Sequence, residues 1–550
     1  MENRIIRKKR VFSAFLVLAL LLCILQSDGY CKKQKTKKDE KKAETAQPVQ
    51  LDKIIGDLAE VIAFNPIPVK GIGLVVGLPN TGSSECPPKI RDYLRQYIVT
   101  QVGSKGAVNP DAMIDSLDTA VVSVEGFIPP GASKYQPFDI TVKALPNTQT
   151  TSLAGGRLYT SELKFVARVE ETIEASKTLA LAAGPVYIDS ITAKSDPRSG
   201  IVLGGGKSMQ DYQVTLAFYK SDFAAAAIVR NRVNQRFGKD VASATSPEVI
   251  YLSIPEQFKD KKERFIELVK SLYITTSAAS EDAHINSLIK NLQTEKDKSK
   301  YQTALEAIGR NASQKLLLLL DSKDESVKFA AAKCLLVIGD SSGMKSLRDY
   351  AQNNASPFRI AAIQTIGDYA SKADTVSLMN RIAGDENLDV RYNAYKYLKK
   401  YDDTSIVRTL VADDFYIDQV IITSPKTIYV SRSHRSGIVL FGAPVDCQKG
   451  IYVESDDGQI IINSLPTEDR LSVMRKHPIT KELMGPLKCS LRLAELIKLL
   501  GDKAEQEDSK KRPGLGVPYS DIVALLKKMV DKGAVDAVFV PGPLSPLASK

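Results

Sequence analysis

Two glycine-rich stretches hold the residues best suited to binding a phosphate group. The first, Gly200 to Ser208, ends in Gly-Gly-Gly-Lys-Ser and is close to a P-loop. A P-loop has four residues between its first glycine and the closing Gly-Lys-Ser, and this count places Ile201 where the tight turn needs glycine. The residues that follow predict a strand, whereas a phosphate site needs a helix N-terminus there. We therefore predict no nucleotide site in this stretch.

The second stretch runs from Gly71 through Gly73 to Gly77 with the spacing GxGxxxG instead of GxGxxG. Pro79 and Asn80 follow where a helix should begin. A dinucleotide site requires a strand, a turn and a helix in that order. We interpret these glycines as backbone requirements of a strand and the loop after it.

The other residues that could do chemistry are scattered. Histidines occur only at positions 284, 434 and 477, which nominates neither a general base nor a metal site. The carboxylates of Glu170-Glu171 and Asp456-Asp457 are adjacent pairs, so on a strand they would face opposite sides and could not form an acid/base couple. We predict no enzymatic activity, no cofactor and no metal.

Cysteine spacing predicts no zinc site, because none of the six cysteines is arranged as CxxC. Loss of Cys23 with the leader described below would leave five: Cys31, Cys86, Cys334, Cys447 and Cys489. Disulfides can form in an oxidising compartment. Cys447 with Cys489 is the preferred pair because both lie in the C-terminal region, but the sequence leaves the connectivity open.

Residues 1–29 have the layout of a secretory signal peptide, with basic residues up to Arg10, an uncharged apolar run over 11–25 and small residues before Tyr30. The run is shorter than the roughly 20 residues that span a bilayer as a helix. An uncleaved N-terminal anchor is the alternative. Residues 30–50 are rich in lysine and poor in apolar side chains, which predicts a disordered tether. We expect an exported protein.

The net charge of +11 is concentrated in this leader and tether. The first 50 residues hold 12 Lys or Arg against 5 Asp or Glu, and the remainder is close to balance. The body therefore has no basic excess typical of nucleic-acid binding, and we predict no nucleic-acid partner.

A length of 550 residues predicts three or four domains. Residues 51–275 mix helices with strands. Helices are predicted over 87–100 and 221–237, the second stopped by Gly238. Runs rich in β-branched residues predict strands over 72–78, 119–124, 138–144, 163–169, 186–192 and 212–218.

Residues 281–413 change to alanine-rich helical patterns that repeat. The segments that begin at Asp324, Ser356 and Asp389 resemble one another at offsets close to 32 residues, with apolar partner segments between them. Each unit predicts a helix pair that buries its apolar face only by stacking on the next pair. The pattern resembles HEAT-like repeats, which bind proteins. A plain helical spacer is the alternative.

Strand signals return in residues 415–550, over 420–422, 427–430, 437–440, 451–453 and 460–463. A helix is predicted from Ser520 or Asp521 through Val530, and a last strand over 536–540. The predicted fold class is α+β, with β-rich regions interrupted by an all-α helical stack.

Several stretches, in order, resemble the bacterial flagellar P-ring protein family. They are KGIGLVVGLPNTG (70–82), AVVSVEGFIPP (120–130), FDITV (138–142), SLAGGRL (152–158), the helix over 222–238, GIVLFG (437–442) and DIVALLKKMVDKGAV (521–535). The resemblance covers 51–275 and 415–545. The repeats over 281–413 lie outside it, as an insertion into the scaffold of the family.

This resemblance implies a secreted structural subunit of the periplasmic P-ring, a bushing around the flagellar rod in the basal body. Implied partners are further copies of the chain, the rod and L-ring proteins, and peptidoglycan, with an unknown protein for the repeats. Assembly candidates are Gly71, Gly73, Gly77, Gly82 and the Pro129-Pro130 turn. A non-flagellar periplasmic interaction scaffold built from the same domains is the alternative.

Overall fold

The computed structural model describes residues 53–547, apart from 63, 103–108, 170–171, 192–194, 275–276, 479, 504, 508–509 and 513. The predicted signal peptide, the predicted tether and Cys31 lie outside the described residues. In the part of the chain that the structure describes, no helix combines the length and apolarity needed to cross a membrane.

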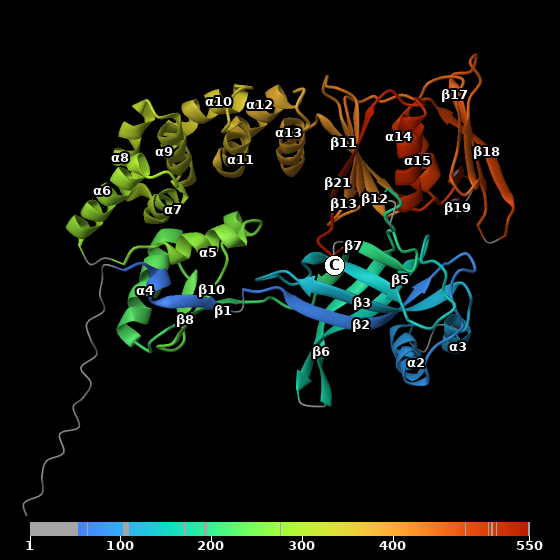
Figure 1. Ribbon diagram of the computed structural model, residues 1–550, viewed down its shortest axis with the longest axis horizontal. Coiled ribbons are helices and arrows are strands. Elements are labelled where there is room, and N and C mark those ends of the chain that lie inside the picture. The colour runs from blue at the N-terminus through green and yellow to red at the C-terminus, as the bar shows by residue number, and fades with distance from the viewer. Residues whose placement is uncertain are drawn as a thin grey trace, which may run out of the picture. The chain divides into compact units, whose positions relative to one another are not determined.

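The first large element is a closed six-stranded barrel (Figure 1). Going around it, the strands are β2 (Ile67–Val76), β3 (Thr119–Ile128), β4 (Pro137–Ala144), β7 (Ser199–Ser208), β6 (Thr172–Pro185) and β5 (Arg157–Val169). Alternating apolar residues fill the interior, as in β3, where Ala120, Val122 and Val124 are fully buried. Helices α2 (Pro88–Val102) and α3 (Pro110–Ile114) pack outside on a smaller core.

A four-stranded antiparallel sheet accompanies the barrel, in the order β1 (Ala59–Ile62), β8 (Val214–Phe218), β10 (Val249–Leu252) and β9 (Ala242–Ala244). Helices α4 (Phe223–Phe237) and α5 (Lys262–Lys270) share its core. The prediction for α4 is confirmed: Asp222 caps its start and Gly238, with φ of +123°, follows its end. Short 3-10 turns lie at Ile55–Asp57 and Glu256–Phe258.

Residues 278–400 form helices only, and we call them the helical segment (Figure 1). The helices are α6 (Ala278–Thr294), α7 (Ser299–Ile308), α8 (Ser313–Leu317), α9 (Glu325–Val337), α10 (Met344–Gln352), α11 (Arg359–Tyr369), α12 (Lys372–Ile382) and α13 (Leu388–Lys400), with short 3-10 turns between some of them. The three repeated sequence segments become the starts of α9, α11 and α13. Consecutive helices contact in pairs, and two apolar cores run along the segment.

The C-terminal part has two sheets with helices α14 (Leu493–Gly501) and α15 (Tyr519–Asp531) between them (Figure 1). One sheet has the order β11 (Ile406–Val411), β12 (Phe415–Val420), β14 (Gly437–Phe441), β13 (Thr427–Arg432) and β21 (Val538–Leu544). The other has the order β15 (Tyr452–Glu454), β16 (Ile460–Asn463), β17 (Arg470–Lys476) and β18 (Leu483–Ser490). A small hairpin joins β19 (Glu505–Glu507) to β20 (Lys510–Arg512).

Sheets and helices thus occur together, which confirms the α+β class. Two predicted strands are wrong. β12 ends at Val420, so Ile421 and Ile422 of the strand predicted over 420–422 lie outside it. β6 ends at Pro185, and the described residues of the stretch over 186–192 make a single isolated bridge, from Tyr187 to Ile201. The chain leaves the barrel wall at this point, and Tyr187 joins the apolar core of the C-terminal part. Helices α5 and α14 and strands β17 and β18 were not predicted.

Candidate functional site

The glycines proposed for assembly have close neighbours inside the barrel. A Cβ atom on Gly71 would lie 2.2 Å from the carbonyl oxygen of Glu162, and one on Gly73 would lie 2.4 Å from Ser161 Oγ. Both glycines are on β2, and both neighbours are on β5, so these glycines permit the close approach that seals the barrel. A role in assembly stays a prediction for them.

The remaining candidates lie in turns. Gly77 has φ of +76° and nothing near its missing Cβ, whereas a Cβ on Gly82 would lie 1.9 Å from the Thr119 carbonyl oxygen. The Pro129-Pro130 turn leads to Gly131, whose carbonyl oxygen accepts a hydrogen bond of 2.6 Å from the buried Lys262 Nζ. Because Lys262 begins α5, this turn connects the barrel to the four-stranded sheet.

The structure brings together a second group of residues, where the barrel meets the C-terminal part. Asp139 on β4 accepts hydrogen bonds from the backbone N–H of Gly204, at 2.8 Å, and of His434, at 3.0 Å. Gly204 has φ of +63°, and a Cβ there would lie 2.3 Å from the His434 carbonyl oxygen. One buried carboxylate therefore holds two backbone segments that are far apart in the sequence.

Aromatic rings extend this contact. The ring of Tyr519, on α15, lies 5.8 Å from the ring of Tyr187 and 5.1 Å from that of Phe415. The Tyr519 hydroxyl is 2.8 Å from the Ser431 carbonyl oxygen and 2.9 Å from that of Gly437. Burial raises the pKa of Tyr519, so its hydroxyl stays a hydrogen-bond donor.

An ion pair completes the contact. Arg432 Nη1 lies 3.1 Å from Asp189 Oδ2, and both side chains are nearly buried. The Tyr187 hydroxyl donates to the other oxygen of Asp189 at 3.1 Å. We call this set the barrel joint; its residues are Asp139, Tyr187, Asp189, Gly204, Phe415, Arg432, His434 and Tyr519.

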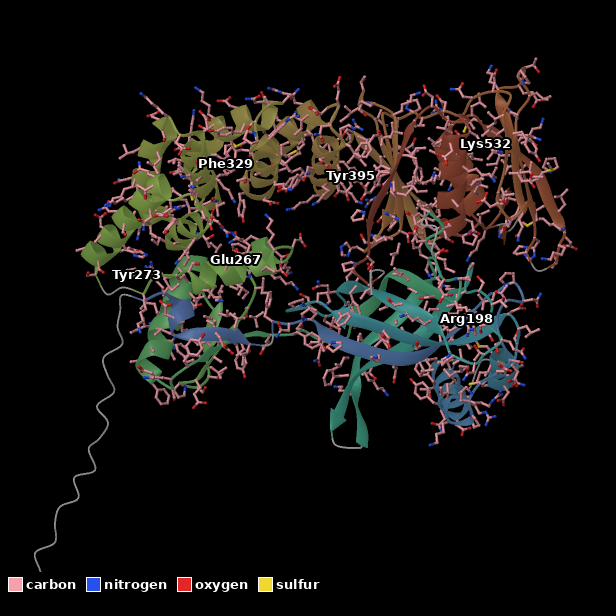
Figure 2. The ribbon with its side chains drawn as sticks, in the orientation of Figure 1. Arg198, Glu267, Tyr273, Phe329, Tyr395 and Lys532 are labelled. Carbon is pink, nitrogen blue, oxygen red and sulfur yellow. The ribbon has the colours of Figure 1, made fainter. Side chains whose placement is uncertain are left out.

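A different contact connects the same five-stranded sheet to helix α13, near the position of Tyr395 in Figure 2. Asp418 on β12 accepts two hydrogen bonds from Arg408, at 2.7 and 2.9 Å, and one from the Tyr395 hydroxyl at 2.5 Å. Lys399 Nζ lies 3.2 Å from the same carboxylate. We call these four residues the stack joint.

Electrostatics favour the ionised form of Asp418 in this joint. Burial alone would raise the pKa of Asp418, but the hydrogen bonds from Arg408 and Tyr395 and the charge of Lys399 outweigh it and lower the pKa. Rings add to the contact, because Tyr392 lies 4.7 Å from Tyr429 and Tyr395 lies 5.8 Å from Phe441, measured between ring centres.

Two serine- and glycine-containing segments have spacings close to those of phosphate-binding or nucleophile motifs. Gly200 to Ser208 lies in strand β7, which was not predicted, and the strand predicted after this stretch is confirmed as β8. The segment Gly339-Asp-Ser-Ser-Gly343 has GxSxG spacing, which the prediction of no enzyme overlooked. Ser341 follows helix α9 and opens a 3-10 turn, whereas a nucleophile elbow requires a strand before the serine.

Metal and thiol chemistry are limited in the described ranges. No group of three or more His, Cys, Asp or Glu side chains there is arranged to hold a metal ion. The predicted Cys447–Cys489 disulfide is not formed in the structure, where both are free thiols around one apolar core. Burial raises the pKa of Cys447 to about 12 and that of Cys489 to about 11. The pairing stays a prediction.

Sequence reasoning missed the two joints as sites. Asp139 lies in the FDITV stretch and Gly204 in the glycine run. The sequence therefore predicts a strand for the first and a turn for the second, but no contact between them. Their common partner, His434, is about 230 residues beyond Gly204, and no local pattern marks that pairing.

Comparison with known proteins identifies relatives of the N-terminal half. A family model described as "Flagellar P-ring protein" matches residues 54–287. Flagellar P-ring proteins of Hydrogenovibrio crunogenus and Geotalea uraniireducens are each 28% identical, over 42% and 40% of this chain and 64% and 61% of their own lengths. That of Thermotoga maritima is 29% identical over 37% of this chain and 61% of its own length. The chain thus spans somewhat less than two thirds of these relatives.

Proposed function

We infer that this chain, whose residues 54–287 match the model of the flagellar P-ring protein family, is a structural subunit of a flagellar P-ring. The role is structural, not catalytic. The family match carries this proposal, because it includes the barrel, the four-stranded sheet and both helices packed on that sheet.

The barrel joint supports the extension of this role to the C-terminal part. Asp139 lies in one stretch that resembles the family, and His434 lies three residues before another, GIVLFG over 437–442. The carboxylate of Asp139 accepts from the backbone N–H of His434, and the backbones of Gly204 and His434 lie close together. Such a contact suits two parts of one scaffold better than two unrelated modules. The helical segment is then an insertion between two parts that pack together.

A ring requires that one face of each subunit fits a different face of its neighbour, so that the contact closes by rotation. We propose that copies of this chain assemble in this way around the flagellar rod in the periplasm, as a bushing. The rod, the L-ring proteins and peptidoglycan are the proposed neighbours. Export would depend on the signal peptide proposed for residues 1–29.

Electron microscopy of the exported full chain tests the proposal. We expect annular particles in negative stain, alone or after addition of isolated rods. Rings that enclose rods in basal bodies purified from the source cells would agree with this. A protein that stays monomeric with and without rods would overturn the ring assignment.

The helical segment favours a second candidate, a periplasmic scaffold that binds another protein. The family match ends at residue 287, inside α6, so most of the helical segment lies beyond it. Deletion of the helical segment, residues 278–400, separates the candidates and leaves strand β11 in its sheet, because a docking role predicts loss of a basal-body component. An unchanged set of ring partners would count against docking.

A further inference from the structure

The helical segment is attached to the rest of the chain at both ends by buried polar contacts. The stack joint is at one end. At the other, helices α6, α7 and α11 contact α4, α5 and the residue before α5 through arginine and lysine side chains. We call this second attachment the sheet joint, formed by Arg232, Arg236, Lys261 and Arg264 with Glu281, Glu306, Ala307, Asp368 and Tyr369.

Glu306 on α7 is the centre of the sheet joint and is fully buried. Its carboxylate pairs with Arg264 from α5 and accepts a hydrogen bond of 2.8 Å from Gln302 Nε2. Arg264 also donates to Thr303 Oγ1 at 2.9 Å. A buried carboxylate without its cation is strongly unfavourable. Separation of α5 from α7 would leave Glu306 without Arg264, so this ion pair holds the two helices together.

Arg236 on α4 caps the C-terminal end of α7. It donates to the carbonyl oxygens of Ala307, at 3.0 Å, and Glu306, at 2.9 Å. These carbonyls lie in the last turn of the helix, where acceptors lack partners within the helix and a positive charge is favourable. Gly309 fits this arrangement, because a Cβ there would lie 2.8 Å from Arg236 Nε.

The sheet joint continues beyond α7. Arg232 Nη2 lies 2.7 Å from Glu281 Oε1, on α6. Lys261 pairs with Asp368 on α11, and its Nζ lies 4.4 Å from the centre of the Tyr369 ring. Asp368 is 87 residues beyond Glu281 in the sequence, so the contact is not confined to the point where the chain enters the helical segment.

The joints connect in a closed circuit. The barrel contacts α5 through Lys262 and Gly131, and the C-terminal part through the barrel joint. The C-terminal part contacts α13 through the stack joint, and the helical segment returns to α4 and α5 through the sheet joint. Of the contacts described above, those through the barrel would be the ones left to couple α4 and α5 to the C-terminal part if the helical segment were removed.

We propose that the helical segment is a brace that fixes the separation between the four-stranded sheet and the C-terminal sheets. A freely moving insertion would need no ion pair to the rest of the chain at either end, whereas a brace needs an attachment at each, as Glu306 and Asp418 provide. The brace is a property of the single chain. Its consequence for assembly, a fixed subunit shape, rests on the proposed ring function.

Opening of the sheet joint in the full chain tests the brace. Glu306→Gln removes the buried charge with little change in shape, and Glu295→Gln is the matched control on an exposed side chain at the end of α6. A zero-length carbodiimide crosslink between Lys261 and Asp368 reports closure at a distance from the substitution. We expect Glu306→Gln to lower the crosslink yield at least fivefold and to increase the maximum dimension in small-angle scattering, with unchanged helix content. Glu295→Gln should match the wild type.

Equal crosslink yield and equal scattering for wild type and Glu306→Gln would overturn the brace. If Glu306→Gln fails to fold, Lys261→Met replaces it, with hydrogen exchange of α5 and α7 and scattering as readouts. That variant should exchange at least threefold faster in both helices, and no change would again overturn the proposal. Both experiments use single chains, so a result for the brace and a failure to form rings can be told apart.

Discussion

The barrel joint and the stack joint hold the same five-stranded sheet by different means. In the barrel joint a carboxylate binds two backbone N–H groups, and the backbones of Gly204 and His434 touch. In the stack joint the carboxylate of Asp418 binds only side chains, from Arg408, Tyr395 and Lys399. A close backbone contact leaves no room for a side chain, so it restricts which residue type can occupy the position. A side-chain cluster depends instead on charge and hydrogen bonding. The two joints should therefore be weakened by different kinds of substitution.

The largest effect is expected for Gly204→Ala in the barrel joint. The added Cβ would lie 2.3 Å from a backbone oxygen, and the left-handed backbone conformation is unfavourable for alanine. We expect a loss of about 2–5 kcal/mol in the free energy of unfolding, from about 1–2 kcal/mol of conformational cost and about 1–3 kcal/mol of overpacking. Urea unfolding followed by circular dichroism measures it.

Gly77→Ala is the matched control, because Gly77 also has positive φ but open space around its missing Cβ. It should lose only about 1–2 kcal/mol, the conformational part. Equal losses for the two variants would show that the contact with His434 contributes nothing to stability.

A third carboxylate, that of Asp521, sharpens the comparison, because burial outweighs the charge of Arg475 and the hydrogen bond from Ser520, whereas the partners of Asp418 outweigh its burial. Burial raises the pKa of Asp521, in the first turn of α15, to about 6, and the charge of Asp457 adds to the rise. The folded state therefore binds this proton more tightly than the unfolded state, where the pKa is about 3.9. The free energy of unfolding should fall as the pH rises from about 4 to about 6.

The measurable consequence is a difference in pH dependence between wild type and Asp521→Asn. A rise of the pKa from its usual value to about 6 corresponds to ~3 kcal/mol of folding stability that is lost at high pH. Because the side chain keeps some solvent exposure, we expect the free energies of unfolding of wild type and variant to diverge by about 2 kcal/mol. Denaturant titrations at pH 4.5 and 7.5 measure the free energy of unfolding. The stability of Asp521→Asn relative to wild type should be higher at pH 7.5 than at pH 4.5. Asp536→Asn, at an exposed position, should follow the wild type. Parallel curves for all three would contradict the prediction.

Local patterns predicted much of the fold and little of the joints. The strand predicted over 72–78 is part of β2, and the helix over 221–237 matches α4, because alternation and capping act within a few residues. The three sequence repeats mark the starts of α9, α11 and α13 for the same reason. The stretch over 186–192 failed as a strand because Tyr187 and Asp189 turn away to contact the C-terminal part.

Long-range pairing was out of reach of these patterns. Asp139 and Gly204 could be singled out from the sequence, yet their contact with His434 depends on how two distant parts of the chain pack. The role of Asp418 could not be predicted, because a single acidic residue within a strand forms no recognisable sequence pattern. Close backbone contacts require glycine, which can be recognised in a sequence. Clusters of charged side chains require no residue pattern that can be recognised in the same way.

A smaller effect is expected for Tyr395→Phe in the stack joint. It removes the hydrogen bond that the hydroxyl donates to Asp418 and the one of 3.0 Å that it accepts from Lys399 Nζ. Both bonds from Arg408 to Asp418 and the ion pair of Lys399 with Asp418 remain. A single hydrogen bond to a charged group contributes about 1.5 kcal/mol, so the free energy of unfolding should fall by about 1–1.5 kcal/mol. Tyr301→Phe, on α7, is the control and should change it by less than about 0.5 kcal/mol. A Tyr395→Phe variant as stable as the control would mean that Arg408 and Lys399 suffice.

The smallest effect is expected for the reactivity of Cys447 and Cys489. Its measurement tests whether a disulfide links these residues in the C-terminal core. The thiolate is the reactive form of cysteine, and the raised pKa values of about 12 and 11 keep both residues protonated in the folded protein. We expect alkylation of both, in the native reduced protein, to be at least tenfold slower than after unfolding. Mass spectrometry with two isotopic labels measures this. Cysteines of the exported protein that stay unlabelled after unfolding, until a reductant is added, would instead be joined in the predicted disulfide. In that case the core that meets the barrel joint would be held by a bond as well as by packing.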